Sequence, residues 1–189
     1  DIAACAALFE GPGRDRETLT KEQNAELDRD IRQLLRLLSP HLLTRGAQEC
    51  IDGLLHRYHA HRWNVDDLLA CALPYHDSPL FTRLLQALQI EGKPQWAWLQ
   101  PLKDKPATLV RSALAKYCGK DFSVLTFVGG IVQETVKLHK SNRALSTFFV
   151  SVWLDTLAAV KSVSPDLVEA ALPAVLTALR RPHLRDSFH

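Results

Sequence analysis

The residues best suited to carry chemistry lie in one short stretch of the sequence. They belong to the types that bind metals and are Asp52, His56, His59, His61, Cys71 and His76. Imidazole, carboxylate and thiolate groups are the ligands that zinc takes in proteins. Asp52, His56 and His59 would share one face of a helix, but that face lies opposite the apolar positions of the same segment, as in an ordinary solvated helix. No glutamate is placed to act as the base for a metal-bound water. We therefore expect no metal site.

Signatures of nucleophilic or nucleotide chemistry are missing from the sequence. It contains no Gly-x-Ser-x-Gly elbow, no Walker lysine and no Gly-x-Gly-x-x-Gly fingerprint. Gly11-Pro12-Gly13 follows no predicted strand and is interpreted as a turn. The four cysteines are far apart, without paired spacing, and border apolar faces, which indicates reduced and buried thiols. We expect no catalytic residue and no cofactor, so the chain is not predicted to be an enzyme.

Basic and aromatic side chains alternate in the same stretch and suggest a second kind of site. Arg45, Arg57 and Arg62, interleaved with Tyr58 and Trp63, could grip phosphates and stack bases. Three nearby aspartates dilute this charge, and the whole chain carries a formal net charge of only +2. A mild overall charge is not typical of a nucleic-acid binder. The three arginines remain candidate RNA-contacting residues.

The polar residues at helix ends in this stretch predict a structural joint formed by Arg57, His61, Asn64, Tyr75 and His76. Helix ends leave backbone amides and carbonyls that need partners. We therefore expect most polar atoms of these five side chains to bond to backbone or to one another. Asn64 is also predicted to cap the helix that begins after it.

Three tryptophans lie in or beside connectors and are candidate partner-binding residues. Trp63, Trp96 and Trp98 belong to no long apolar stripe. Aromatic side chains often carry much of the binding energy of a protein interface. Tryptophan is also highly buried on average, so burial against the core remains the alternative for each.

The elements that must position these residues are helices, because apolar positions recur at helical spacing along the whole chain. No alternating run bounded by hairpin turns indicates a sheet. About eight helices with short connectors leave a compact bundle or a solenoid, and units recurring at roughly 40 residues favour an α-α superhelix of the HEAT or armadillo kind. The predicted helices are about 21–38, 45–59, 65–72, 79–88, 108–117, 121–140, 144–163 and 164–181.

Several local features refine this fold. Gly129 and Gly130 inside a helix indicate close approach by a neighbouring helix, since glycine otherwise costs ~1 kcal/mol there. The helices around 121–140 and 144–163 are apolar on most sides and are expected to be innermost, and Pro173 predicts a kink. Arg181-Pro182 resembles the start of a further helix. With no secretory signal, no apolar run long enough to span a membrane and no methionine, residues 1–189 are expected to be one helical-repeat domain from a longer protein.

Three segments carry a resemblance to a known family: LDRDIRQLLRLLSPHLL, LLHRYHAHRWNVDDLLACALPYHDSPLFTRLLQAL and WAWLQPLK. Together they resemble the N-terminal region of the large HEAT repeat-containing subunit of the small-subunit processome, the U-three small nucleolar RNA-associated protein ten family. The resemblance covers residues 27–102 well and continues more loosely to Ser187. Residues 91–95 differ from the family pattern.

The resemblance implies a nucleolar scaffold rather than an enzyme. The family belongs to the subcomplex that engages the 5′ external transcribed spacer of pre-ribosomal RNA and couples its transcription to processing. The expected partners are other processome subunits, chiefly WD-repeat proteins with helical C-terminal tails, with pre-rRNA and the U-three snoRNP bound by the whole complex and no membrane involved. Two functions stay open at this point: docking of a sister subunit, or direct contact with spacer RNA.

Overall fold

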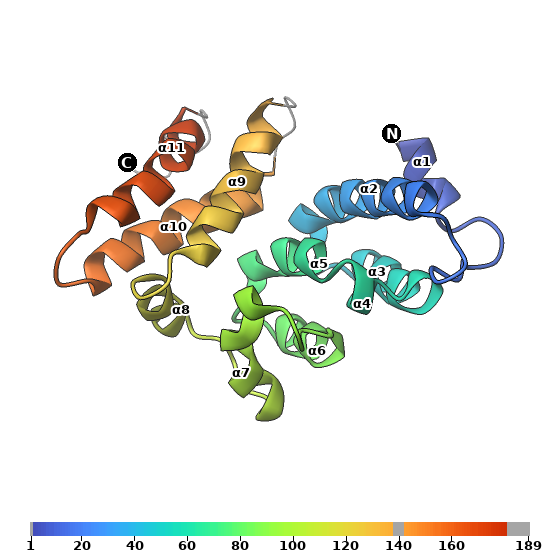
Figure 1. The fold of residues 1–189 in the computed structure, drawn as a ribbon, viewed down its shortest axis with the longest axis horizontal. Helices are drawn as coiled ribbons and strands as arrows, with labels where there is room; N and C mark the ends of the chain where they lie inside the picture. Colours follow the sequence, from blue (N-terminus) through green and yellow to red (C-terminus); the bar gives the residue numbers. More distant parts are fainter. Residues whose placement is uncertain (1, 138–141, 181–189) are drawn as a thin grey trace.

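The computed structural model describes residues 2–137 and 142–180, and within these ranges the chain is built of helices without a strand (Figure 1). The α-helices are α1 (Ile2–Ala7), α2 (Lys21–Leu38), α3 (Arg45–Tyr58), α4 (Ala60–Trp63), α5 (Val65–Ala72), α6 (Pro79–Ala87), α7 (Gln100–Asp104), α8 (Arg111–Cys118), α9 (Ser123–Lys137), α10 (Arg143–Ala159) and α11 (Pro165–Leu179). Three short 3₁₀ helices connect them: η1 (Ser39–His41), η2 (Leu73–Tyr75) and η3 (Pro94–Leu99). The prediction of an all-α, HEAT-like superhelix is confirmed.

Local capping signals explain where several helices begin. Thr20 accepts a hydrogen bond from the backbone of Gln23, whose side chain bonds back to the backbone of Thr20, so the pair forms a capping box for α2. Ser78 caps α6, and Pro79 occupies its first turn, where its missing N–H costs nothing. The predicted helix starts at residues 21 and 79 are confirmed.

Helices alternate between two layers, as in an α-α superhelix. In the C-terminal half, α9 packs against α11 while α10 packs against α8, and α9 and α11 lie side by side in Figure 1. In the N-terminal half α2 packs against α5. In the same half, α3 and α6 lie in the other layer. An ion pair between Asp52 and Arg83 and apolar side chains of both helices join α3 to α6.

The core runs without interruption through both halves. One cluster of buried apolar residues extends from Cys5 to Val175 among the described residues. The N-terminal part of α10 contacts η1 and η2, which ties the two halves together, and Phe149 at its centre is fully buried. The prediction that α10 lies among the innermost helices agrees with this burial.

The paired glycines of α9 have different surroundings. A Cβ built on Gly129 would lie 3.0 Å from the Cβ of Ala174 on α11 and 3.3 Å from the ring of Phe149 on α10. A Cβ on Gly130 would meet nothing within 4 Å. The expected close approach therefore holds for Gly129 and is wrong for Gly130. The further helix start expected at residues 181–184 lies outside the described residues.

Candidate functional site: a groove beside a buried arginine

An arginine that the sequence pattern does not single out links the loop before α2 to α2 itself and to the start of α5. Arg16 lies in the segment before α2 and is only 1% exposed. Its Nε donates to the Oδ1 of Asn24 at 2.8 Å, its Nη1 to the Oδ1 of Asn64 at 3.0 Å and its Nη2 to the Oδ1 of Asp28 at 2.5 Å. The guanidinium also lies 4.9 Å from the ring centroid of Trp63. A buried charge is stable only with such a set of partners.

Asn64 completes this network. Its Nδ2 donates to the Oδ1 of Asp28 at 2.9 Å, so the amide joins both members of the Arg16–Asp28 ion pair. Asn64 stands at the position before α5, but its side chain makes no capping bond there. The prediction of a side-chain cap is wrong, because the amide is held by partners from α2 and from the segment before it.

Arg57 of the expected joint holds the N-terminal segment against α3. Its Nη2 donates to the carbonyls of Glu10 and Gly11, and the neighbouring Tyr58 donates its hydroxyl to the carbonyl of Leu8. Gly13 packs on the same place, where a Cβ would lie 2.7 Å from the carbonyl oxygen of Arg57. Residues 8–13 thus form a strap over the C-terminal end of α3.

Tyr75 and His76 lie at a separate place, beside η1 and the segment before α8. The Tyr75 hydroxyl donates to the carbonyl of Ser39 at 2.6 Å. The His76 Nδ1 lies 2.6 Å from the carbonyl oxygen of Leu109, and because a carbonyl only accepts, Nδ1 carries the proton. Burial raises the pKa of Tyr75 above its ordinary value.

The five residues of the expected joint therefore occupy more than one place, and no hydrogen bond joins any two of them in the described part of the chain. Arg57, Tyr75 and His76 bond to backbone carbonyls, whereas Asn64 bonds to side chains. Burial is the main cause that lowers the pKa of His61, and the neighbouring His59 adds to it. The proposed structural role of this set stays a prediction.

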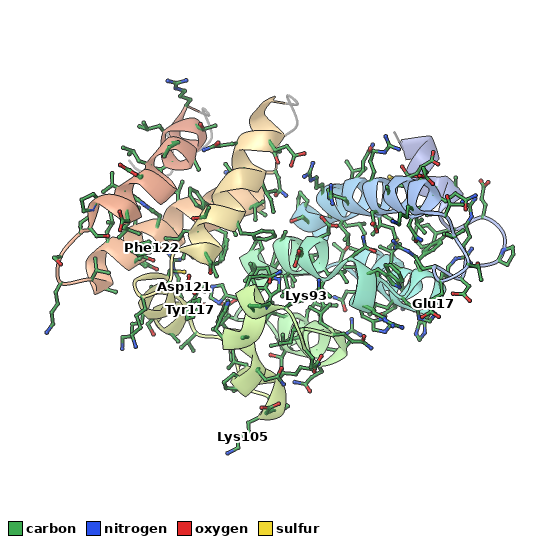
Figure 2. All side chains as sticks on the ribbon, viewed as in Figure 1. Glu17, Lys93, Lys105, Tyr117, Asp121 and Phe122 are labelled. Carbon is green, nitrogen blue, oxygen red and sulfur yellow. The ribbon has the colours of Figure 1, made fainter. Side chains whose placement is uncertain are left out.

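The three candidate RNA-contacting arginines do not form one patch. Arg45 and Arg57 are separated by twelve positions of α3, which corresponds to about 18 Å along the helix axis. Arg45 pairs with Glu49 at 2.8 Å, and Arg62 pairs with Glu17, labelled near α3 and α4 in Figure 2, at 3.1 Å. Each of these guanidiniums therefore already has an anionic or carbonyl partner.

The three tryptophans differ in exposure. Trp96 is 1% exposed, and its Nε1 donates to the Oδ1 of Asp66 at 2.6 Å, so burial against the core, the alternative left open for each tryptophan, holds for Trp96. Trp98 is half-buried and stacks on Tyr117 with ring centroids 4.4 Å apart. Tyr117 in turn donates to Asp121, which lies beside it in Figure 2. Trp63 is 40% exposed.

Trp63 lies at a groove between α2, α5 and α9 with a volume of about 290 Å³. Its apolar lining includes Leu35 and Ala70 together with Phe127 and Ile131 of α9, the last two partly exposed. These three helices lie next to one another where the N-terminal and C-terminal halves meet in Figure 1. An exposed aromatic ring and several apolar side chains thus line the same groove.

Acidic groups are in excess along this groove. Four carboxylates (Asp28, Asp66, Asp67 and Glu134) and two guanidiniums (Arg32 and Arg36) line it. Arg32 pairs with Asp67 at 2.8 Å and Arg36 with Glu134 at 2.7 Å. The hydrogen bond that Arg32 donates to Asp67 is the main cause that raises the pKa of Arg32. Asp66 accepts from Trp96 and Gln95 but has no ion pair among the described residues.

The buried thiols are poor nucleophiles. Burial raises the pKa of Cys71 and of Cys118 to about 12, so both are protonated at neutral pH. Residues 2–137 and 142–180 contain no group of three or more side chains of the His, Cys, Asp and Glu types placed to hold a metal ion. In the same ranges, no helix has both the length and the apolar character of a membrane-spanning segment.

Stacked helices in two layers, with a groove between neighbouring helices, define this chain as an α-helical repeat protein. It is 34% identical over 174 residues to the human HEAT repeat-containing protein 1 and 34% identical over 176 residues to the zebrafish protein of that name, each match covering 88% of this chain. It is 31% identical over 159 residues to the U3 small nucleolar RNA-associated protein 10 of Mycosarcoma maydis, covering 79% of this chain. No family model matches.

The chain belongs to the family that these proteins form, named HEAT repeat-containing protein 1 and U3 small nucleolar RNA-associated protein 10. It spans 7–8% of the length of the three relatives. The suspected family is thereby confirmed.

The sequence offers little signal for Arg16, Asp28 and Asn24. Arg16 lies in a charged loop that resembles an exposed connector, and its partners lie 8 to 48 positions away. The helical pattern of residues 21–38 places Asp28 and Arg32 on the solvated face. Only the arrangement of α2, α5 and the preceding loop brings these groups together.

Proposed function

We propose that this chain is a non-catalytic docking module of ribosome small-subunit biogenesis, acting in pre-rRNA transcription and processing within the nucleolus. The names of its relatives support the link to the U3 small nucleolar RNA. The direct partner is a sister processome subunit, and the favoured class is a WD-repeat protein with a helical C-terminal tail. Pre-rRNA and the U3 snoRNP are engaged by the whole complex.

The observation that carries the docking function is the groove between α2, α5 and α9 with Trp63 exposed at it. Helical-repeat proteins recognise partners through side chains on exposed helix faces and connectors. Exposed aromatic side chains beside arginines are the common anchors of protein interfaces. The buried Arg16 network fixes the end of α4 and thereby holds Trp63 in place.

Direct contact with RNA is the alternative, and the ion pairs weigh against it. Arg45 and Arg62 are paired with glutamates, and Arg57 is held by the strap. A phosphate would have to displace these partners, while a salt-dependent grip on RNA needs several free cations.

A pull-down of this chain against each processome subunit separately tests the proposal. We expect one protein subunit to be retained after nuclease treatment. Retention of RNA alone, or of no subunit, would contradict the docking function. Trp63→Ala should weaken the retained complex, while the control Trp98→Phe, which keeps an aromatic ring on Tyr117, should leave it unchanged.

A further inference from the structure

We infer that the groove between α2, α5 and α9 receives a partner segment that presents a lysine or arginine beside apolar side chains. This inference rests on the proposed docking function and names the site and the chemistry of its occupant. The groove is defined by its apolar residues Leu35, Ala70, Phe127 and Ile131, its acidic residues Asp66, Asp67 and Glu134, and Trp63.

The charge balance of the groove selects a cation. Three of its four carboxylates are each paired with an arginine, Asp28 with the buried Arg16 behind the lining, which leaves the carboxylate of Asp66 as the excess negative charge. Arg32 and Arg36 are both used in ion pairs with Asp67 and Glu134, so they are not free to attract an anionic occupant. Like charge placed opposite like charge is unfavourable at an interface, and this disfavours an acidic peptide or an RNA phosphate.

Asp66 is the group best placed to receive that cation. It lies in the first turn of α5 and has no cationic partner among the described residues. Its Oδ1 is fixed by the indole Nε1 of the buried Trp96 at 2.6 Å. Asp67, next to it, is only 18% exposed in its side chain and is oriented by Arg32. A carboxylate that neighbours hold in place loses little side-chain entropy on binding.

The apolar side chains of the groove determine the second feature of the partner segment. Phe127 and Ile131 lie one turn apart on α9 and are both partly exposed, so an apolar side chain can pack on them. At the same groove the Trp63 ring, 40% exposed, can cover the aliphatic stem of a lysine or arginine. The occupant therefore needs a basic residue near Asp66 and Trp63 and an apolar residue over α9.

The test uses the subunit retained in the pull-down and compares two variants with equal changes of charge. Asp66→Asn with Asp67→Asn removes two charges from the groove, and the amide oxygen that replaces the carboxylate at position 66 can still accept from Trp96. Asp77→Asn with Glu169→Gln removes two charges at positions outside the groove. Thermal unfolding monitored by circular dichroism checks that both variants fold.

We expect the groove variant to weaken binding about tenfold at low ionic strength, less at high salt, and the control variant to change it less than about twofold. Trp63→p-benzoylphenylalanine should cross-link, under light, to a subunit segment that carries a lysine or arginine. The same photo-reactive group at the exposed Leu176 of α11 serves as the control. Once that basic residue of the subunit is changed to glutamine, the groove variant should bind as tightly as the unaltered chain does. This comparison is a double-mutant cycle across the interface.

The remaining outcomes distinguish a failure of the docking function from a failure of the inferred site. If no subunit is retained, the docking function fails and this inference fails with it. If a subunit is retained but the groove variant and the control bind equally, docking stands and the groove is not the site. Tighter binding by the groove variant, or a cross-link from position 63 to RNA or to a segment without a basic residue, overturns the inferred chemistry.

Discussion

The Nη1 of Arg16 donates to the Oδ1 of Asn64 at 3.0 Å and joins two residues that are 48 positions apart. This bond ties the loop before α2 to the start of α5, and Asp28 of α2 accepts from both side chains. Because Arg16 also lies over Trp63, the same network supports one end of the groove. The position of an exposed aromatic ring thus depends on a buried charge.

The first prediction is that Arg16→Ala strongly destabilises the fold. Removing the guanidinium takes the donor from the Oδ1 atoms of Asn24 and Asn64 and leaves the carboxylate of Asp28 with the Asn64 amide alone. Breaking a buried pair costs about 3–5 kcal/mol. Since Asp28 is 35% exposed in its side chain, we expect the lower end of that range. Urea unfolding measures the loss, with Arg14→Ala, at an exposed position, as the control. Equal stability of the two variants would contradict the role of the network.

The helices could be predicted from the sequence because their signals are local. The expected bounds of 21–38 for α2 agree with the structure, since a capping box begins it and Ser39-Pro40 follows it. The start of α6 at Pro79 depends only on Ser78 and on the proline itself. Such features involve residues a few positions apart and need no knowledge of the fold.

The site could be predicted only in part, because its contacts are distant in sequence. The position of Trp63 beside a connector marks it as a candidate, but the groove beside it needs α9, whose Glu134 lies 98 positions from its partner Arg36. Trp96 lies in a connector, and its burial depends on Asp66, 30 positions away, and on the ring of Phe127. No local pattern in the sequence identifies these distant partners.

The second prediction separates the paired glycines of α9. Gly129→Ala should lower stability by about 1–3 kcal/mol, because its methyl group would press on Ala174 and Phe149. Gly130→Ala meets nothing within 4 Å and should raise stability by up to ~1 kcal/mol through helix propensity. Chemical denaturation of both variants is the measurement. The opposite order of stability would show that α11 does not approach α9 at Gly129.

The third prediction concerns the buried thiols. With their pKa raised to about 12, Cys71 and Cys118 should react with iodoacetamide at pH 8 at least ~100-fold more slowly than the half-buried Cys50. Mass spectrometry of the folded and of the guanidinium-unfolded protein gives the rates, and unfolding should remove the difference. The folded state keeps protons that the unfolded chain releases near pH 9, so stability should fall as pH rises from about 9 towards 12. Rapid labelling of Cys71 in the folded protein would contradict this.

The fourth prediction tests the RNA alternative. Arg57→Ala with Arg62→Ala removes two of the three candidate cations. If docking is the function, this variant should bind a single-stranded spacer RNA as weakly as the unaltered chain does at physiological salt. Filter binding at several salt concentrations measures this. A salt-sensitive affinity that the double substitution abolishes would instead favour direct RNA contact.

The fifth prediction contrasts two tryptophans that share one candidate role in the sequence. Trp96 is fully buried and donates to Asp66, and its ring lies nearly perpendicular to that of Phe127 with the centroids 5.2 Å apart. Trp96→Ala should therefore cost the ~3–5 kcal/mol of a core aromatic residue. Trp63 is 40% exposed, and Trp63→Ala loses mainly its contact with Arg16, worth about 0.5–2 kcal/mol of stability. If Trp63 anchors the sister subunit, the same change should weaken binding by ~2 kcal/mol or more. Calorimetric unfolding and titration of the retained subunit measure the two quantities separately. A Trp63→Ala protein that binds normally would remove Trp63 from the interface, whatever its effect on folding.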